Sequence, residues 1–345
     1  MSLPIISLAR LNGSDDERRV ELEALREATH SVGFFYLTDT GLPAEQAPKL
    51  FRAAREFFDQ PTAVKQEIAI ENSPHYRGYT SLGDERTQGK TDWREQIDLA
   101  VERTPGFDED RPWTVLNGPN QWNDASLPLK NVVEGWLAQT TRISQKLLEA
   151  WAESLGQRPD FFTGIGGEAY EALKVIHYPE LADYSGEIDQ GVGAPKDPGV
   201  LTLLLLEPGS TGLQVDQDGA WEDVEAIPDA FVVNIGELLE WATDGYLVAT
   251  KHRVLPTRAG HDRYSIPFFY YPSLDERFPK LELPEELRAE TRGVGSDLHG
   301  EQIFDQVGRN ILKSRLRAHP NVTERFHSEL AAALGAAPEV QPEKV

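Results

Sequence analysis

The chain has 345 residues, of which 39% are hydrophobic and 9% aromatic, so it can bury a substantial core. Its formal net charge of -23 argues against nucleic acid and anionic lipid as partners, because both require a basic face. The absence of cysteine excludes disulfides and thiolate metal sites. The N-terminus does not resemble a signal peptide, and no apolar run approaches the ~20 residues of a membrane span. We therefore expect a cytoplasmic protein, and the sequence leaves its oligomeric state open.

The first part of the chain is predicted to contain alternating strands and helices. We expect strands over residues 3–8 and 33–37 and helices over residues 14–31 and 44–59. Ser14 and Glu17 form a capping box, which marks the start of the first of these helices. Residues 60–130 are rich in Pro, Gly, Asp and Asn, and we expect them to form a long irregular region with a functional role.

A long helix is predicted over about residues 130–155, since its apolar side chains recur every three or four positions and Gly156 can end it. Short apolar segments separated by turns then fill residues 172–272, which indicates a β-sandwich or barrel. We expect strands over residues 175–178, 200–206, 212–215, 231–235, 246–249 and 264–271. Helix returns over about residues 300–335.

Two residues of the β region have side chains that are typical of an iron site. Non-haem Fe(II) enzymes hold the metal with two histidines and one carboxylate, the first two in a His-x-Asp turn. Here Asp197 lies in such a turn, and His252 follows 55 positions later, about the separation that brings a facing strand back to it. Two residues before the aspartate, however, the chain has Pro195, which offers no donor atom. Loss of supporting partners alone weakens metal binding by roughly 10–100-fold, so we expect a weakened site.

A second pair of residues predicts a binding site for a carboxylate. Arg263 and Ser265 are two positions apart in an expected strand, so their side chains point to the same face. A guanidinium can donate two parallel hydrogen bonds to a carboxylate, and the serine hydroxyl can add a third. This pair begins eleven positions after His252, and that spacing favours the carboxylate-binding role over a purely structural one.

Several further motifs occur along the chain in a fixed order: Pro4–Leu8, Gly33–Tyr36, Arg77–Tyr79, Trp93–Glu95, His177–Pro179, Gly212–Val215 and Val233–Gly236. Together with the metal and carboxylate motifs, they resemble the 2-oxoglutarate/Fe(II)-dependent oxygenases of the isopenicillin N synthase-like group. The resemblance implies a mainly β fold, a double-stranded β-helix (jelly-roll) core with flanking helices. It also implies an N-terminal region over residues 1–125 and a helix-supported core over residues 126–345, within one compact unit.

The same resemblance implies an activity and roles for individual residues. The activity is that of a dioxygenase that uses Fe(II), 2-oxoglutarate and O₂ to hydroxylate, desaturate or cyclise a small-molecule substrate. Asp197 and His252 are implied as the catalytic iron ligands. Arg263 and Ser265 are implied on the distal carboxylate of 2-oxoglutarate, with Tyr178 as a further contact to this co-substrate.

Pro195 is the departure from the family pattern, which reads Gly-Val-Gly-x-His-x-Asp at this point. Three hypotheses follow: an active oxygenase that uses Asp197, His252 and water or another ligand; a fold repurposed to bind a small molecule without metal; or a natural or engineered site variant of an ordinary oxygenase. The retained arginine and serine favour the oxygenase class. We also expect His177 to be a packed core residue and Lys196 to face solvent.

Overall fold

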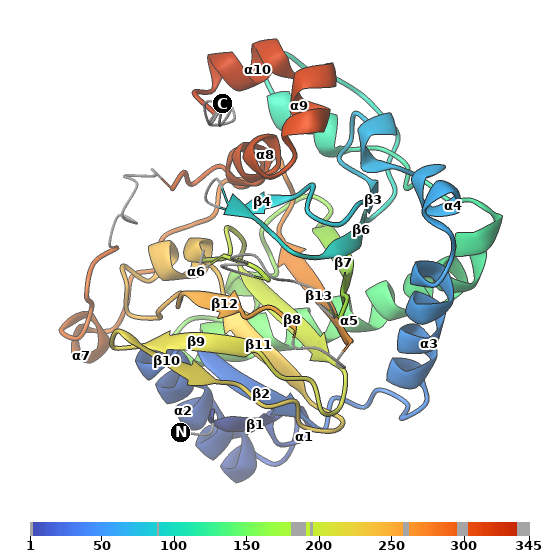
Figure 1. Ribbon diagram of the computed structural model, residues 1–345. Helices are drawn as coiled ribbons and strands as arrows, with labels where there is room; N and C mark the ends of the chain where they lie inside the picture. The colour runs from blue at the N-terminus through green and yellow to red at the C-terminus, as the bar shows by residue number, and fades with distance from the viewer. Residues whose placement is uncertain are drawn as a thin grey trace.

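The computed structural model describes residues 3–87, 90–180, 191–193, 196–257, 262–294 and 303–336. The described strands are β1 (Ile5–Ser7), β2 (Phe34–Thr38), β3 (Gly78–Thr80), β4 (Arg86–Thr87), β5 (Lys90–Thr91), β6 (Glu95–Ala100), β7 (Tyr170–Tyr178), β8 (Leu201–Leu206), β9 (Leu213–Gln217), β10 (Ala220–Asp223), β11 (Phe231–Ile235), β12 (His252–Val254) and β13 (Arg263–Tyr271). A large sheet has the order β1-β2-β11-β8-β13-β7-β6-β3, and a small sheet has the order β10-β9-β12 (Figure 1). This arrangement confirms the expected mainly β core with flanking helices.

The described α-helices are α1 (Leu8–Leu11), α2 (Asp15–Ser31), α3 (Gln46–Phe58), α4 (Thr62–Gln66), α5 (Leu127–Ser154), α6 (Glu237–Ala242), α7 (Glu285–Arg288), α8 (Val307–Ala318), α9 (Pro320–Phe326) and α10 (Ser328–Ala333). The long helix α5 packs against α2 and α3 and supports β7, β8 and β13. Helices α8, α9 and α10 lie together at the end of the molecule where β3, β4 and β6 are found (Figure 1). None of the described helices is both long and apolar enough to cross a membrane.

The two faces of the large sheet have different surroundings, and strand β2 shows the division. Phe35 and Leu37 belong to the main hydrophobic core, which the sheet shares with α2, α3 and α5. Phe34 and Tyr36 belong instead to a smaller apolar cluster, which includes Leu213 and Val215 of the small sheet. Because successive side chains of a strand point to opposite sides, this alternation defines an outer face under the helices and an inner face toward the small sheet.

Several predicted elements are confirmed, and two predictions are wrong. The capping box of Ser14 and Glu17 is present at the start of α2. Residues 60–130 are not irregular throughout, because β3 and β6 extend the large sheet beside β7. Residues 246–249 do not form a strand, since the carbonyl of Thr29 at the end of α2 accepts from Val248 N and the ring of Tyr246 stacks on His30. These residues resemble a strand in sequence because they are apolar, but packing against α2 buries them without strand pairing.

Gly236, just before α6, lies unusually close to the turn that contains Asp197. Its amide donates to Val200 O at 2.8 Å, and the next amide, of Glu237, donates to Asp197 O at 2.8 Å. A Cβ atom at Gly236 would lie 2.2 Å from Gly199 O, so only glycine allows this backbone approach. The start of α6 therefore fixes the position of the Asp197 turn.

We predict that Gly236→Ala destabilises the fold by about 1–3 kcal/mol, because the added methyl group must push the two backbone segments apart. The matched control is Gly135→Ala in α5, where an added Cβ meets nothing within 4 Å. The control should stabilise the protein by about 0.5–1 kcal/mol, since alanine is the better helix former. Urea unfolding of both variants measures the two effects, and equal stability of Gly236→Ala and the unaltered protein would refute the close-approach argument.

Candidate metal and co-substrate site

The carboxylate of Asp197 is held by one pair of neighbouring strands. Thr202 Oγ1 of β8 donates to Asp197 Oδ2 at 2.6 Å, and Asn234 Nδ2 of β11 donates to the same oxygen at 2.8 Å. Thr202 and Asn234 are direct cross-strand partners, so the sheet register fixes both donors together. With Oδ2 engaged, Oδ1 is the oxygen that faces the second candidate ligand.

That second residue is His252, at the start of β12 in the small sheet. Its Nε2 atom lies 3.9 Å from Asp197 Oδ1. Its Nδ1 atom lies 3.3 Å from the carbonyl oxygen of Thr250, which can only accept a hydrogen bond, so this contact favours the proton on Nδ1 and a free lone pair on Nε2. The ring edge of Phe34 packs on the imidazole, with 5.4 Å between centroids. One carboxylate oxygen, from the turn before β8, and one imidazole nitrogen, from the start of β12, therefore point toward each other.

Asp197 and His252 offer donor atoms of the types that bind iron, but they provide only two such side chains. Carboxylate oxygen and neutral imidazole nitrogen are the donor types of non-haem Fe(II) sites. Among the described residues, no group of three or more His, Cys, Asp or Glu side chains could hold a metal ion. Pro195, the residue at the expected third position, lies outside the described residues. Within the described part of the chain, Asp197 and His252 are thus the two side chains that offer such donors to a metal.

The predicted carboxylate site is also assembled on the inner face of the large sheet. Arg263 is the cross-strand partner of Tyr178, and Ser265 is the partner of Ile176. All of these side chains are buried, and the guanidinium of Arg263 lies 4.5 Å from the centre of the Tyr178 ring. The Nε and Nη1 atoms of Arg263 have no hydrogen-bond partner among the described residues. A buried cation with unsatisfied donors is costly, so this site suits an anion.

Two neighbouring side chains take no part in this arrangement. His177 points to the outer face, where its Nδ1 lies 2.7 Å from Glu95 Oε1 and its Nε2 lies 3.1 Å from Asp262 Oδ2, as expected for a packed histidine. Lys196 does not face solvent as predicted, because its Nζ atom pairs with Glu240 Oε2 at 2.7 Å. Glu240 is itself buried and needs a cation nearby, which explains why this lysine turns inward.

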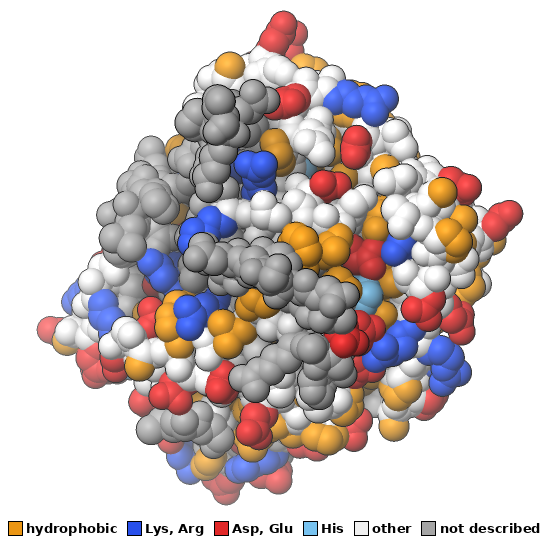
Figure 2. Space-filling model, in the orientation of Figure 1, with side chains coloured by type: hydrophobic (Ala, Val, Ile, Leu, Met, Phe, Trp, Pro, Cys, Tyr) orange, Lys and Arg blue, Asp and Glu red, His pale blue; other side chains and the backbone are white. Residues whose placement is uncertain are grey.

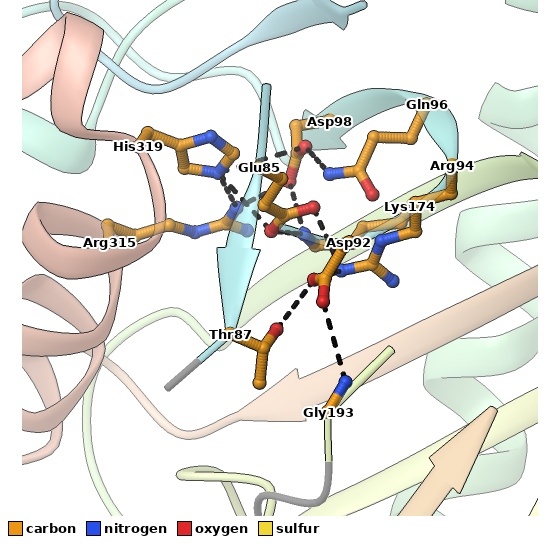
Figure 3. A network of polar contacts seen from close by, with 10 residues as sticks. All are labelled: Glu85, Thr87, Asp92, Arg94, Gln96, Asp98, Lys174, Gly193, Arg315 and His319. Atoms are coloured by element: carbon orange, nitrogen blue, oxygen red, sulfur yellow. Dashed lines mark hydrogen bonds and ion pairs between the residues drawn. The ribbon is translucent and has the colours of Figure 1, made fainter. Parts of the chain in front are cut away.

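A buried network of charged and polar residues, not predicted from the sequence, lies beside this site. Its members lie next to β4 and β5, at or just before β6, in β7, and in α8 with the residue that follows it. They are Glu85, Asp92, Arg94, Gln96, Asp98, Lys174, Arg315 and His319 (Figure 3). The amide of Gly193, in the same motif as Asp197, lies 3.4 Å from Asp92 Oδ1. The polar residues at alternate positions 94, 96 and 98 were the available signal, because alternation in a strand places them on one face.

Burial and pairing have strong effects on the network's acids and bases. Burial alone would raise the pKa of Glu85, but the cations of Arg94 and Lys174 lower it to about 2. Burial and the nearby Glu85 charge raise the pKa of Asp92 to about 6 despite its contact with Arg94. Burial lowers the pKa of His319 to about 4, so this residue is neutral at pH 7. The network therefore contains three carboxylates and three cations, and their formal charges cancel.

The acidic charge of the whole chain does not form one patch over this region. On the face shown in Figure 2, acidic and basic side chains are interspersed around the perimeter. On this face the acidic side chains therefore do not gather into a single strongly charged patch.

Comparison with known proteins identifies the family. Residues 3–125 match the family model described as the N-terminal region of non-haem dioxygenases in morphine synthesis, and residues 170–272 match that of the 2OG-Fe(II) oxygenase superfamily. The chain is 33% identical over 341 residues to the 2-oxoglutarate-dependent dioxygenase frbJ of Dothideomycetidae sp. (strain 11243), a match that covers 94% of this chain and 92% of that protein.

Two further relatives cover nearly the whole chain. The homoarginine-6-hydroxylase 2-ODD-C23.1 of Arabidopsis thaliana is 31% identical over 326 residues, which cover 90% of this chain and 98% of that protein. A solved structure of a 2OG-Fe(II) oxygenase family protein from Caulobacter crescentus has a TM-score of 0.72 and 28% identity, over 92% of this chain and 99% of that chain. The chain described here therefore belongs to the 2OG-Fe(II) oxygenase superfamily, and it is an iron- and 2-oxoglutarate-dependent enzyme of small molecules.

Proposed function

We propose that this oxygenase holds its iron with Asp197 and His252 and its co-substrate with Arg263, Ser265 and Tyr178. The observation that carries the proposal is the convergence of Asp197 Oδ1 and His252 Nε2, which lie 3.9 Å apart on the inner face. The same face holds a buried guanidinium, two nitrogens of which have no hydrogen-bond partner among the residues that the structure describes. Bound iron would supply the O₂-dependent oxidation that is coupled to consumption of 2-oxoglutarate.

In this proposal the protein orients the Asp197 carboxylate and 2-oxoglutarate and shields their contacts from water. Thr202 and Asn234 restrain the Asp197 carboxylate, so one oxygen is presented to the metal in a fixed direction. Arg263 and Ser265 bind the distal carboxylate of 2-oxoglutarate, and their burial excludes water that would compete for these hydrogen bonds. The Tyr178 ring supports the guanidinium from its face, which fixes the direction of its donors.

We further propose that Pro195 stands where a third protein ligand would be, so water completes the coordination in this chain. The relative named homoarginine-6-hydroxylase indicates an amino-acid substrate for that protein. Amino acids are for this reason the first substrate class we propose for the present chain. Hydroxylation, desaturation and cyclisation all remain outcomes of the same proposed site.

Replacing Pro195 with histidine is expected to tighten Fe(II) binding by at least 10-fold and to raise 2-oxoglutarate turnover, because an imidazole replaces a water ligand. The matched control is Pro195→Ala, which removes the same proline without adding a donor. Anaerobic Fe(II) titration by calorimetry and an assay of 2-oxoglutarate consumption measure both effects. If the histidine and alanine variants bind iron equally, Pro195 does not occupy the ligand position.

Arg263→Ala is expected to abolish measurable 2-oxoglutarate binding, and Arg263→Lys to weaken it, since lysine lacks the two-pronged donor. Arg55→Ala serves as the control, because its guanidinium also lies over a tyrosine ring, that of Tyr264, at 4.2 Å, but on the outer face. Calorimetric titration of 2-oxoglutarate into the Mn(II)-loaded variants makes the comparison. Unchanged affinity in Arg263→Ala would remove this residue from the co-substrate site.

Thr202→Val is expected to weaken Fe(II) binding by roughly 10-fold, because one of the two restraints on Asp197 is lost while the side-chain volume is kept. Thr140→Val is the matched control: this buried hydroxyl donates within α5, to Trp136 O at 2.9 Å. Both variants should lose about 1 kcal/mol of stability, but only the first should alter iron affinity. An equal iron affinity in the two variants would contradict the role of Thr202.

A further inference from the structure

The inner face of the large sheet continues past the proposed co-substrate site into the buried network of Figure 3. Gln96 of β6 is the cross-strand partner of Ile176, which in turn is the partner of Ser265, so all three lie in one row across the sheet. On the other side, Asp92 contacts the amide of Gly193 in the motif that holds Asp197. The network is thus adjacent to the co-substrate residues through β7 and to the Asp197 motif through Gly193.

Most polar atoms of the network have partners, but two buried ones do not. Gln96 is fully buried; its amide nitrogen donates to Asp98, whereas its Oε1 atom has no partner among the described residues. The contact with Asp98 also fixes the orientation of the amide, since the opposite orientation would place two acceptors together. One buried acceptor is therefore left without a donor.

The second unpartnered atom is a donor. Arg94 is 7% exposed, and one of its terminal nitrogens, Nη2, lies 2.9 Å from Glu85 Oε2 and 3.2 Å from Asp92 Oδ2. Its Nε atom has no partner within the described part of the chain. Arg94 and Gln96 are two positions apart, which in an extended backbone puts their Cα atoms about 7 Å apart with the side chains on the same face.

The balance of charge decides which ligand these two atoms suit. The three carboxylates and three cations of the network already cancel, so a ligand with a net charge would leave an uncompensated charge in a buried site. A zwitterion adds no net charge. Its ammonium can donate to Gln96 Oε1 and to the adjacent carboxylates, and its carboxylate can accept from Arg94 Nε.

We propose that Arg94 and Gln96, supported by Glu85 and Asp92, form the substrate subsite of this oxygenase and bind the ammonium and carboxylate groups of a free amino acid. This inference rests on the proposed function, because it assumes that the substrate lies beside the co-substrate. Buried ion pairs usually stabilise a core less than apolar side chains of the same volume do, and a substrate-binding role explains the presence of this network.

The test uses binding, so it does not depend on turnover. The protein loaded with Mn(II) and 2-oxoglutarate is titrated calorimetrically with each of the twenty proteinogenic L-amino acids. We expect at least one to bind, and its N-acetyl and carboxamide derivatives, which each lose one charge, to bind at least 10-fold more weakly. These derivatives test the charge requirement on the unaltered protein, so this part of the test does not depend on the folding of any variant.

Gln96→Leu then tests the residue itself and should weaken amino-acid binding at least 10-fold while 2-oxoglutarate affinity stays unchanged. Gln60→Leu is the matched control, because the side-chain amide of Gln60 donates to Glu56 O in an exposed contact. If 2-oxoglutarate binds but no amino acid does, the subsite and the amino-acid substrate class are wrong, while the proposed iron and co-substrate sites stand. If Gln96→Leu binds the amino acid as well as the control does, the subsite alone is wrong. If 2-oxoglutarate itself does not bind, the proposed function fails first.

Discussion

Successive side chains of a strand point to opposite faces, and this alternation places the chemistry and the core of the protein on different sides of one sheet. The outer face packs under α2, α3 and α5 and carries most of the main hydrophobic core, with His177 and Glu95 as a polar pair near the β6 edge. The inner face holds Thr202 and Asn234 beside Asp197, and Arg263 and Ser265 farther along. A shift of one residue in any of these strands would exchange the two sets, so the register of the sheet fixes the site.

The buried polar groups of the inner face are stable there because they form hydrogen bonds and ion pairs with one another. The Asp197 carboxylate has two donors across the β8–β11 pair, and the turn that carries it is held by the amides of Gly236 and Glu237. In the adjacent network, removal of one partner from a buried pair typically costs about 3–5 kcal/mol. Such mutual restraint links the residues that flank β4 and β5, and also α8, to the large sheet, and it connects them to the Asp197 motif at Gly193.

The sequence predicted the core elements well where periodicity or a local signal was strong. The capping box of Ser14 and Glu17, the long helix α5 and the strand β11 are found at the expected places. Motif spacing also selected Asp197 and His252, which the fold brings within 3.9 Å. Local pattern was misleading at residues 246–249, where tertiary packing under α2 replaces strand pairing.

The contacts that sequence could not predict are long-range pairings between polar residues. Nothing local indicates that Lys196 pairs with Glu240, or that Arg315 in α8 reaches Asp98 in β6. These partners are distant in sequence. The carboxylate that each cation contacts depends on which one the fold buries near it. The alternation of residues 94, 96 and 98 was visible, but their meaning depended on β6 being part of the sheet rather than of a loop.

The central claim is that Asp197 and His252 are enough to hold iron in the presence of 2-oxoglutarate. Anaerobic titration of Fe(II) into the protein with 2-oxoglutarate, followed by visible absorption, tests it most directly. The account predicts a charge-transfer band of the chelated metal that saturates at one iron per chain. The absence of both a band and any heat of binding would show that the unaltered chain does not assemble this site.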